Sequence, residues 1–115
     1  MLPKGYRLRR RKDFKKVYVK GDSAAGRYVV VYALKNNNLE TSRFGFSVSK
    51  KIGKAVQRNR FKRMLREICR RNINSFAAGF DIIVIARRKI IEVSYKEIEK
   101  DLMKLAKKLK LTVGK

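Results

Sequence analysis

The stretch that decides the fold runs from Lys50 to Glu67 and reads KKIGKAVQRNRFKRMLRE. Apolar residues recur inside it at helical spacing, so they can share one side of a helix while the cations cover the rest. These apolar residues are Val56, Phe61 and Leu65, and Ile68 follows just beyond the stretch on the same side. Across residues 43–71, eleven lysines and arginines face a single acid. The pattern predicts a folded scaffold that holds a fixed array of positive charge, and the natural partner of such an array is a polyphosphate chain.

The size and composition of the chain suit one compact domain over residues 1–115. With 115 residues and an apolar content of 44%, the chain can build one hydrophobic core. Charged residues make up 36% of it, and the formal net charge is +23. So large an excess of like charge opposes compaction, and an anionic partner would relieve it. Residues 1–11 are basic and show little periodicity, so we expect a flexible arm there.

The rarer residue types limit the chemistry that this chain can perform. There is one cysteine, Cys69, and no histidine. A single cysteine excludes an internal disulfide and a cysteine-based zinc site, and the lack of histidine removes the commonest general base. We expect Cys69 to pack inside as a small apolar residue. The acids between Glu92 and Asp101 lie among lysines, so we expect solvated pairs on a helix. The sequence therefore predicts neither a catalytic residue nor a metal site in this chain.

Two further absences bear on location. No apolar run approaches the roughly 18 residues that a membrane-spanning helix needs. The first residues lead into basic ones without the apolar stretch of a secretory signal. We therefore expect a cytoplasmic protein.

Three helices and three strands are expected, in an α+β sandwich of order αββαβα. Helices are expected at residues 12–20, at residues 56–72 and after a capping box formed by Ser94 and Glu97. Strands are expected at residues 28–34, 43–49 and 80–86, with a loop at 22–27. We expect the first two strands to form an antiparallel hairpin. The third is apolar on both faces, which is typical of a central strand.

The tripeptide Arg58-Asn59-Arg60 lies near the start of the expected long helix. Arginine offers a planar fork of donors that fits phosphate oxygens in pairs, and asparagine can bind a 2′-hydroxyl or a base edge. The alternative is a solvated helix face that keeps the protein soluble. Six neighbouring cations favour phosphate binding over that alternative. They are Lys50, Lys51, Lys54, Lys62, Arg63 and Arg66.

Four aromatic residues form a second candidate site. Phe14 and Tyr18 share one face of the first expected helix, and Tyr28 and Tyr32 share one face of the first expected strand. If that helix packs across the sheet, the rings can line one concave surface, where they would stack on unpaired bases. The alternative is ordinary core packing, and the sequence leaves both open.

Three segments carry a resemblance to a known family. Residues 51–63 match the pattern Lys-x-Gly-x-Ala-x-x-Arg-Asn-x-x-Lys-Arg, which is the hallmark of the bacterial ribonuclease P protein subunit. Residues 12–18, KDFKKVY, are similar to that family's Asp-Phe-x-x-Val-Phe segment, with Tyr18 in place of the final phenylalanine. Residues 80–87, FDIIVIAR, resemble its central strand. The resemblance spans nearly the whole chain.

The resemblance implies a fold and an activity. The fold would be an α-β sandwich, similar to domains in a ribosomal protein and in elongation factor G, with a left-handed βαβ crossover through the basic helix. The protein would bind a large catalytic RNA and the single-stranded 5′ leader of precursor tRNA. That RNA, with Mg²⁺ held mainly by the RNA and the substrate, would cleave the precursor endonucleolytically and so mature the tRNA 5′ end.

The resemblance also assigns roles to individual residues. Those that would bind the catalytic RNA are Lys51, Lys54, Arg58, Asn59, Arg60 and Arg63. Those that would bind the leader are Phe14, Tyr18, Tyr32, Lys62 and Arg66. A structural ribosomal RNA-binding protein shares the size, charge and fold and is the alternative. A self-contained nuclease would need a carboxylate cluster or a histidine.

Overall fold

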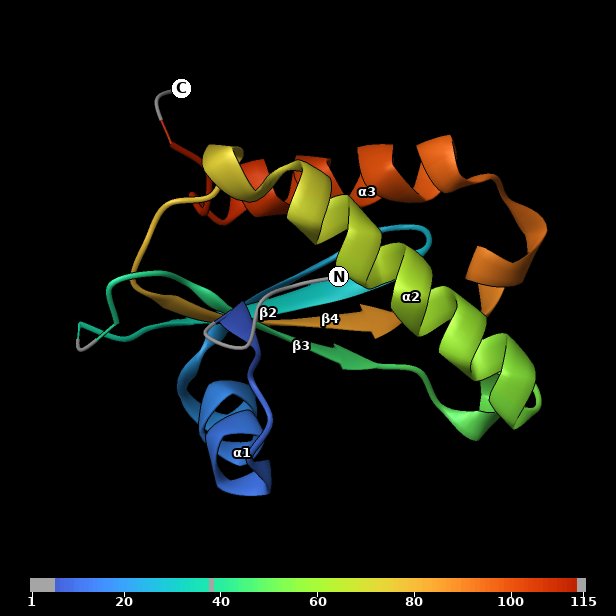
Figure 1. The fold of residues 1–115 in the computed structure, drawn as a ribbon, viewed down its shortest axis with the longest axis horizontal. Helices are drawn as coiled ribbons and strands as arrows, with labels where there is room; N and C mark the ends of the chain where they lie inside the picture. Colours follow the sequence, from blue (N-terminus) through green and yellow to red (C-terminus); the bar gives the residue numbers. More distant parts are fainter. Residues whose placement is uncertain (1–5, 38, 114–115) are drawn as a thin grey trace.

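The computed structural model describes residues 6–37 and 39–113 and contains three helices around a four-stranded sheet (Figure 1). The helices are α1 (Arg11–Lys20), α2 (Ala55–Arg71) and α3 (Tyr95–Lys108). The strands are β1 (Asp22–Ala25), β2 (Val29–Lys35), β3 (Arg43–Ser47) and β4 (Phe80–Ala86). Three short 3₁₀ helices are η2 (Lys50–Ile52), η3 (Ile73–Ser75) and η4 (Arg88–Glu92). This arrangement confirms the predicted α+β class.

The strand order in the sheet is β1-β2-β4-β3. β4 pairs antiparallel with β2 and parallel with β3, so the apolar strand is central, as predicted. The predicted hairpin between residues 28–34 and 43–49 is wrong, because β4 lies between these two strands. The hairpin partner of β2 is instead β1, which falls in the predicted loop. The sequence of β1, DSAA, buries only Ala24, so no apolar alternation marks it as a strand.

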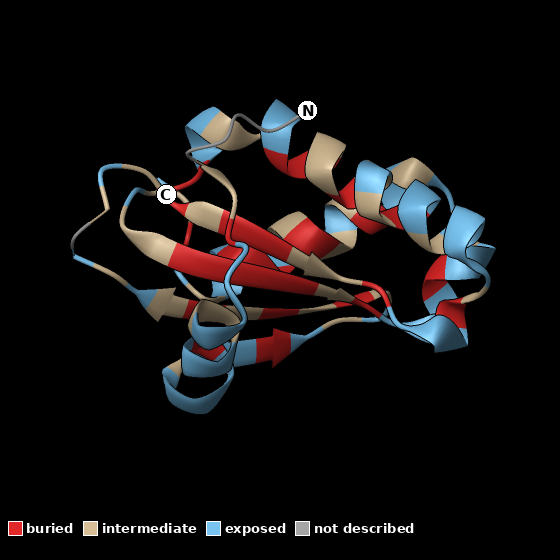
Figure 2. Cartoon of the chain, turned by 60° about the horizontal axis from the view of Figure 1, so that its bottom comes forward, coloured by how far each residue is buried: buried red, intermediate tan, exposed pale blue. Residues whose placement is uncertain are grey.

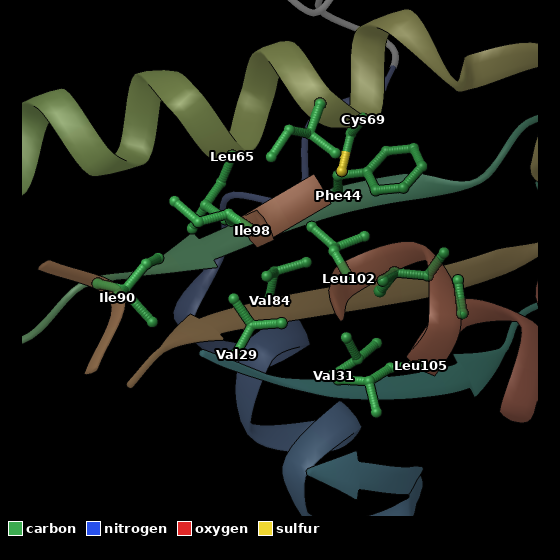
Figure 3. Packing of buried hydrophobic residues seen from close by; sticks show 14 of the residues in the cluster. Val29, Val31, Phe44, Leu65, Cys69, Val84, Ile90, Ile98, Leu102 and Leu105 are labelled. Carbon is green, nitrogen blue, oxygen red and sulfur yellow. The ribbon is translucent and has the colours of Figure 1, made fainter. Parts of the chain in front are cut away.

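Two helices cover one face of the sheet and one helix covers the other (Figure 1). α2 and α3 pack over the main hydrophobic core, where Leu65, Ile98 and Leu102 meet Val84 of the central strand (Figure 3). α1 packs on the opposite face over a smaller cluster of Leu8, Val17 and Ile83. Figure 2 shows buried residues concentrated on the strands and on the inward sides of the helices. The solvent-facing sides of the helices can therefore carry the charge.

Most of the predicted apolar side of α2 faces the core. Phe61, Leu65 and Ile68 are buried there, and Cys69 is fully buried beside them, as predicted. Val56, however, is 82% exposed and does not belong to this side. It lies in the first turn of α2, and α2 begins beyond the end of β3 (Figure 1).

Part of the basic N-terminal segment is docked on the sheet. Arg7 forms a parallel bridge with Phe44, and the N–H of Leu8 donates to the carbonyl oxygen of Phe44 at 2.8 Å. The Leu8 side chain is buried against α1 and the sheet. Within the basic arm expected over residues 1–11, residues 7 and 8 are thus docked on the sheet. Residues 1–5 of that prediction lie outside the described part of the chain.

Asp101 has a tertiary role that the sequence did not reveal. Its carboxylate accepts hydrogen bonds from the backbone N–H groups of Arg27, Tyr28 and Val29, at 3.3, 2.8 and 3.1 Å. The expected solvated pairing is thus wrong for this residue. The carboxylate instead fixes the turn between β1 and β2 against α3.

Candidate RNA-binding surface

The N-terminal half of α2 presents an exposed strip of cations. Lys51 lies in η2 and Lys54 is the N-cap residue, and both are exposed. Along the helix, Asn59, Arg60 and Arg63 are exposed, whereas Arg58 is half-buried. The six residues predicted to bind the catalytic RNA therefore lie along one continuous segment, from η2 into α2.

The first turn of α2 is electrostatically arranged for an anion. No acidic residue lies in this turn, and no side chain caps it. The unpaired N–H groups and the positive end of the helix dipole would normally be stabilised by acids. Here they are surrounded by lysine and arginine, so the turn attracts an external anion more strongly than an ordinary helix start does.

The cations in the two halves of α2 differ in their intramolecular partners. In the C-terminal half, Arg70 forms an ion pair with Glu67, and the Arg71 guanidinium lies 5.8 Å from the centre of the Tyr95 ring. Arg43, before the helix, binds Asp81 through two hydrogen bonds of 2.7 and 2.9 Å. Across the described residues, no carboxylate pairs with a cation between positions 50 and 66. The cations in the N-terminal half of α2, which have no ion-pair partner among the described residues, can therefore bind phosphate.

Three of the predicted aromatic residues do come together beneath the sheet. The rings of Phe14 and Tyr18 on α1 are 6.4 Å apart, and Tyr18 meets Tyr32 of β2 edge to face at 5.0 Å. Tyr18 is 38% exposed, so one side of this cluster is open to solvent. Burial raises the pKa of Tyr18, although a hydrogen bond with the Ser47 side chain opposes that shift. The neutral hydroxyl therefore remains the form present at physiological pH.

Tyr28 does not belong to this aromatic cluster. It lies just before β2 and packs against the main core on the other face of the sheet. The prediction that it shares a face with Tyr32 is wrong, because the backbone at Tyr28 belongs to the turn held by Asp101 rather than to the regular strand.

A pocket of about 230 Å³ lies between α1, β3 and α2. Phe14 lies against Gly45 of β3 on one side, and Arg66 of α2 lines the other. Arg66 of the basic helix and Phe14 of the aromatic cluster thus line the same pocket. Lys62, one helical turn before Arg66, is half-buried on the same helix. Of the five residues predicted to bind the leader, Phe14 and Arg66 line this pocket, whereas Tyr18, Tyr32 and Lys62 do not.

Sequence reasoning missed two cations of this pocket, Arg7 and Arg9. Both lie in the segment that was expected to be a flexible arm. The signal was the alternation Arg7-Leu8-Arg9, which has the period of an extended strand with one side buried. Because Leu8 is anchored to Phe44, the arginines on either side of it are held in the lining of the pocket.

Comparison with known proteins identifies the family. The ribonuclease P family profile matches residues 2–110. The ribonuclease P protein component of Alkaliphilus oremlandii is 46% identical over 105 residues, which cover 91% of each chain. The counterpart from Clostridioides difficile is 42% identical over 107 residues, or 92% of this chain and 93% of that one.

Solved structures agree with the sequence relatives. A Staphylococcus aureus RNase P protein mutant with defective mRNA degradation activity superposes with a TM-score of 0.87 at 39% identity, covering 94% of this chain and 91% of that one. The RNase P protein from Thermotoga maritima superposes with a TM-score of 0.82 at 42% identity, covering 89% and 96%.

The chain belongs to the ribonuclease P protein family, which confirms the resemblance seen in the sequence. Members of this family are protein components of a ribonucleoprotein endoribonuclease of tRNA processing. This chain is such a component. In the described residues, no helix has the length and apolar character required to cross a membrane.

Proposed function

We propose that this protein is the subunit of ribonuclease P that binds the catalytic RNA through η2 and the N-terminal half of α2. The contacting residues are Lys51, Lys54, Arg58, Asn59, Arg60 and Arg63. The observation that carries this proposal is the exposed strip of cations, which has no carboxylate partner among the described residues and is held in place by Phe61 and Leu65 in the core. Each cation that neutralises a phosphate releases a counterion, which favours binding in low salt.

We further propose that the cleft between α1 and the sheet binds the single-stranded 5′ leader of precursor tRNA. The rings of Phe14, Tyr18 and Tyr32 supply stacking surfaces, and Lys62 and Arg66 supply charge at the edge. A precursor gains these contacts and a mature tRNA does not, so the cleft favours substrate over product.

In this proposal the catalytic RNA performs the hydrolysis, in the cytoplasm, with Mg²⁺ held by the RNA and the substrate. Among residues 6–37 and 39–113, no group of three or more aspartate, glutamate, cysteine or histidine side chains comes together. We assign no step to an ion bound by the protein. The role of the protein is to offset phosphate charge and to hold the leader in position.

The decisive experiment is specific 5′ cleavage of precursor tRNA at low Mg²⁺ by a ribonuclease P RNA, with and without this protein. We expect cleavage to require both components. Protein alone serves as the control, and cleavage by it would contradict the assignment of the chemistry to the RNA. With about six to ten phosphate contacts, affinity for the RNA should fall by roughly 10³–10⁵ between 50 and 200 mM salt, using the duplex figure as a guide. A flat salt response would refute the proposed mode of binding.

A further inference from the structure

A second basic surface lies at the end of the sheet where β4 leads into η4. A pocket of about 940 Å³ opens there between the β1–β2 turn, η4 and α3. Its floor is apolar, formed by Ala25, Ile91 and Leu105, and Ile91 is 47% exposed. The side chains around this floor are mainly cationic. They are Arg27, Arg87, Arg88, Lys89, Lys104 and Lys108.

The six cations of this pocket outnumber its two acids. Two acids also line the pocket, but the carboxylate of Asp101 is occupied by three backbone N–H groups of the β1–β2 turn. The other acid, Glu92, is exposed. Arg87 donates from Nη1 to the carbonyl oxygen of Gly26 at 2.8 Å, which fixes its position without cancelling its charge. In the part of the chain that the structure describes, none of the pocket's cations forms an ion pair.

The topology joins this pocket to the basic start of α2. Because β3 and β4 are parallel, the segments that follow them, η2 and η4, lie at the same end of the sheet and pack against each other. Because β2 is antiparallel to β4, the turn that carries Arg27 lies at this end as well. Basic segments from three parts of the sequence therefore lie at the end of the sheet where α2 also begins (Figure 1).

We infer that the surface for the catalytic RNA continues from the start of α2 around the end of the sheet into this pocket, which binds further phosphates of the same RNA. Cations from three separate segments can follow a bent polyphosphate backbone, and the apolar floor can pack against a ribose or a base. The inference rests on the proposed function. The occupant is the catalytic RNA rather than the leader, because α3 packs on the opposite face of the sheet from α1 and its aromatic cluster.

The test compares two double variants of α3. Lys104→Ala with Lys108→Ala removes two cations that line the pocket, whereas Lys96→Ala with Lys107→Ala removes two exposed cations of the same helix that do not. Affinity for a ribonuclease P RNA is measured at several salt concentrations. For the pocket variant we expect the slope of log affinity against log salt to become about one to two smaller in magnitude, and affinity at 0.15 M salt to fall by up to roughly 5-fold per lysine. The control should match the wild type.

Further measurements distinguish a failure of this inference from a failure of the proposed function. Arg88→Ala, on η4, should reduce affinity in the same way, which guards against a local effect in α3. If the wild type binds the RNA and both double variants bind equally well, the inference is overturned while the proposed function stands. If the wild type does not bind, the proposed function itself fails. A pocket variant that loses its preference for leader-bearing substrate instead of affinity for the catalytic RNA would also overturn the inference.

Discussion

The ring of Phe14 on α1 lies so close to Gly45 on β3 that a methyl group on this glycine would overlap the ring carbon Cζ. Gly45→Ala should therefore push Phe14 out of its place in the proposed leader cleft. We expect a loss of about 1–3 kcal/mol in the free energy of unfolding, since overpacking a close contact costs this much. Urea unfolding measures it. We also expect a weaker preference for precursor over mature tRNA, and an unchanged preference would separate Phe14 from the leader site.

Replacing Tyr32 by alanine should remove one stacking surface from the aromatic cluster. We expect the preference for leader-bearing substrate to fall by about 1–3 kcal/mol, the worth of one stacked base, while Tyr32→Phe retains most of it. Tyr28→Ala is the matched control, because Tyr28 packs in the main core on the other face of the sheet. Affinities of the assembled protein and RNA for precursor and for mature tRNA measure the effect. Equal losses for Tyr32→Ala and Tyr28→Ala would refute the cleft assignment.

Replacing Arg58 and Arg60 by alanine should weaken binding of the catalytic RNA and reduce the magnitude of the salt slope by about two, one for each phosphate contact. The double variant Arg70→Ala, Arg71→Ala changes the same charge on the same helix. Its arginines already interact with Glu67 and Tyr95, so we expect a smaller effect. Titration of labelled RNA decides the comparison. The assignment fails if the two variants lose affinity equally.

Asp101→Ala should destabilise the fold without affecting RNA contacts on α2. The carboxylate accepts three backbone hydrogen bonds across more than 70 positions of sequence. Leaving these N–H groups without an acceptor should cost about 1–3 kcal/mol. Glu40→Ala, at an exposed acid in the loop between β2 and β3, should change the unfolding free energy by less than about 0.5 kcal/mol. Thermal unfolding of both variants checks this, and similar midpoints would show that Asp101 is not a tertiary anchor.

The stability of the protein should fall at alkaline pH because of Cys69. Burial raises the pKa of this thiol in the folded state, whereas in the unfolded chain it titrates near its usual value of about 8.5. Above that pH the unfolded state binds fewer protons than the folded state, so stability decreases, by at most about 1.4 kcal/mol per pH unit. Cys69→Ala should be less stable at pH 7 by about 1 kcal/mol.

The difference between the wild type and Cys69→Ala isolates this effect from the titration of other groups. Urea unfolding at pH 7, 9 and 10 should show the gap between the two proteins nearly closing by pH 9 and reversing in favour of Cys69→Ala by pH 10. A gap that stays constant would mean that the thiol also ionises readily in the folded protein.

The sequence alone was sufficient for the three long helices and for the strands β2, β3 and β4. Three short-range signals each predicted the right element. They are the apolar spacing in α2, the run of β4 that is apolar on both faces, and the capping box at Ser94. The Oγ atom of Ser94 accepts from the N–H of Glu97, as the capping box requires. The charge pattern of residues 50–66 likewise needs no tertiary information, because cations at helical spacing around an apolar stripe must face outward.

What the sequence could not fix was which distant segments meet. The pairing of β3 with β4 rather than with β2 depends on the crossover through α2, and β1 becomes a strand only because β2 offers it an edge. The gathering of Arg7, Arg9 and Arg66 at one pocket depends on Leu8 being anchored to Phe44.

The sequence by itself determined that this chain is a basic α+β domain suited to bind a polyanion. Composition and hydrophobic periodicity can be read without knowing which distant residues meet. Only the tertiary structure decided which cations remain free, which aromatic rings share a cleft and where the second basic pocket lies. The physical reason is that ion pairs, ring contacts and pocket walls form between residues far apart in the chain. Asp101, which looks like a solvated helix acid in the sequence, holds the β1–β2 turn once the chain has folded.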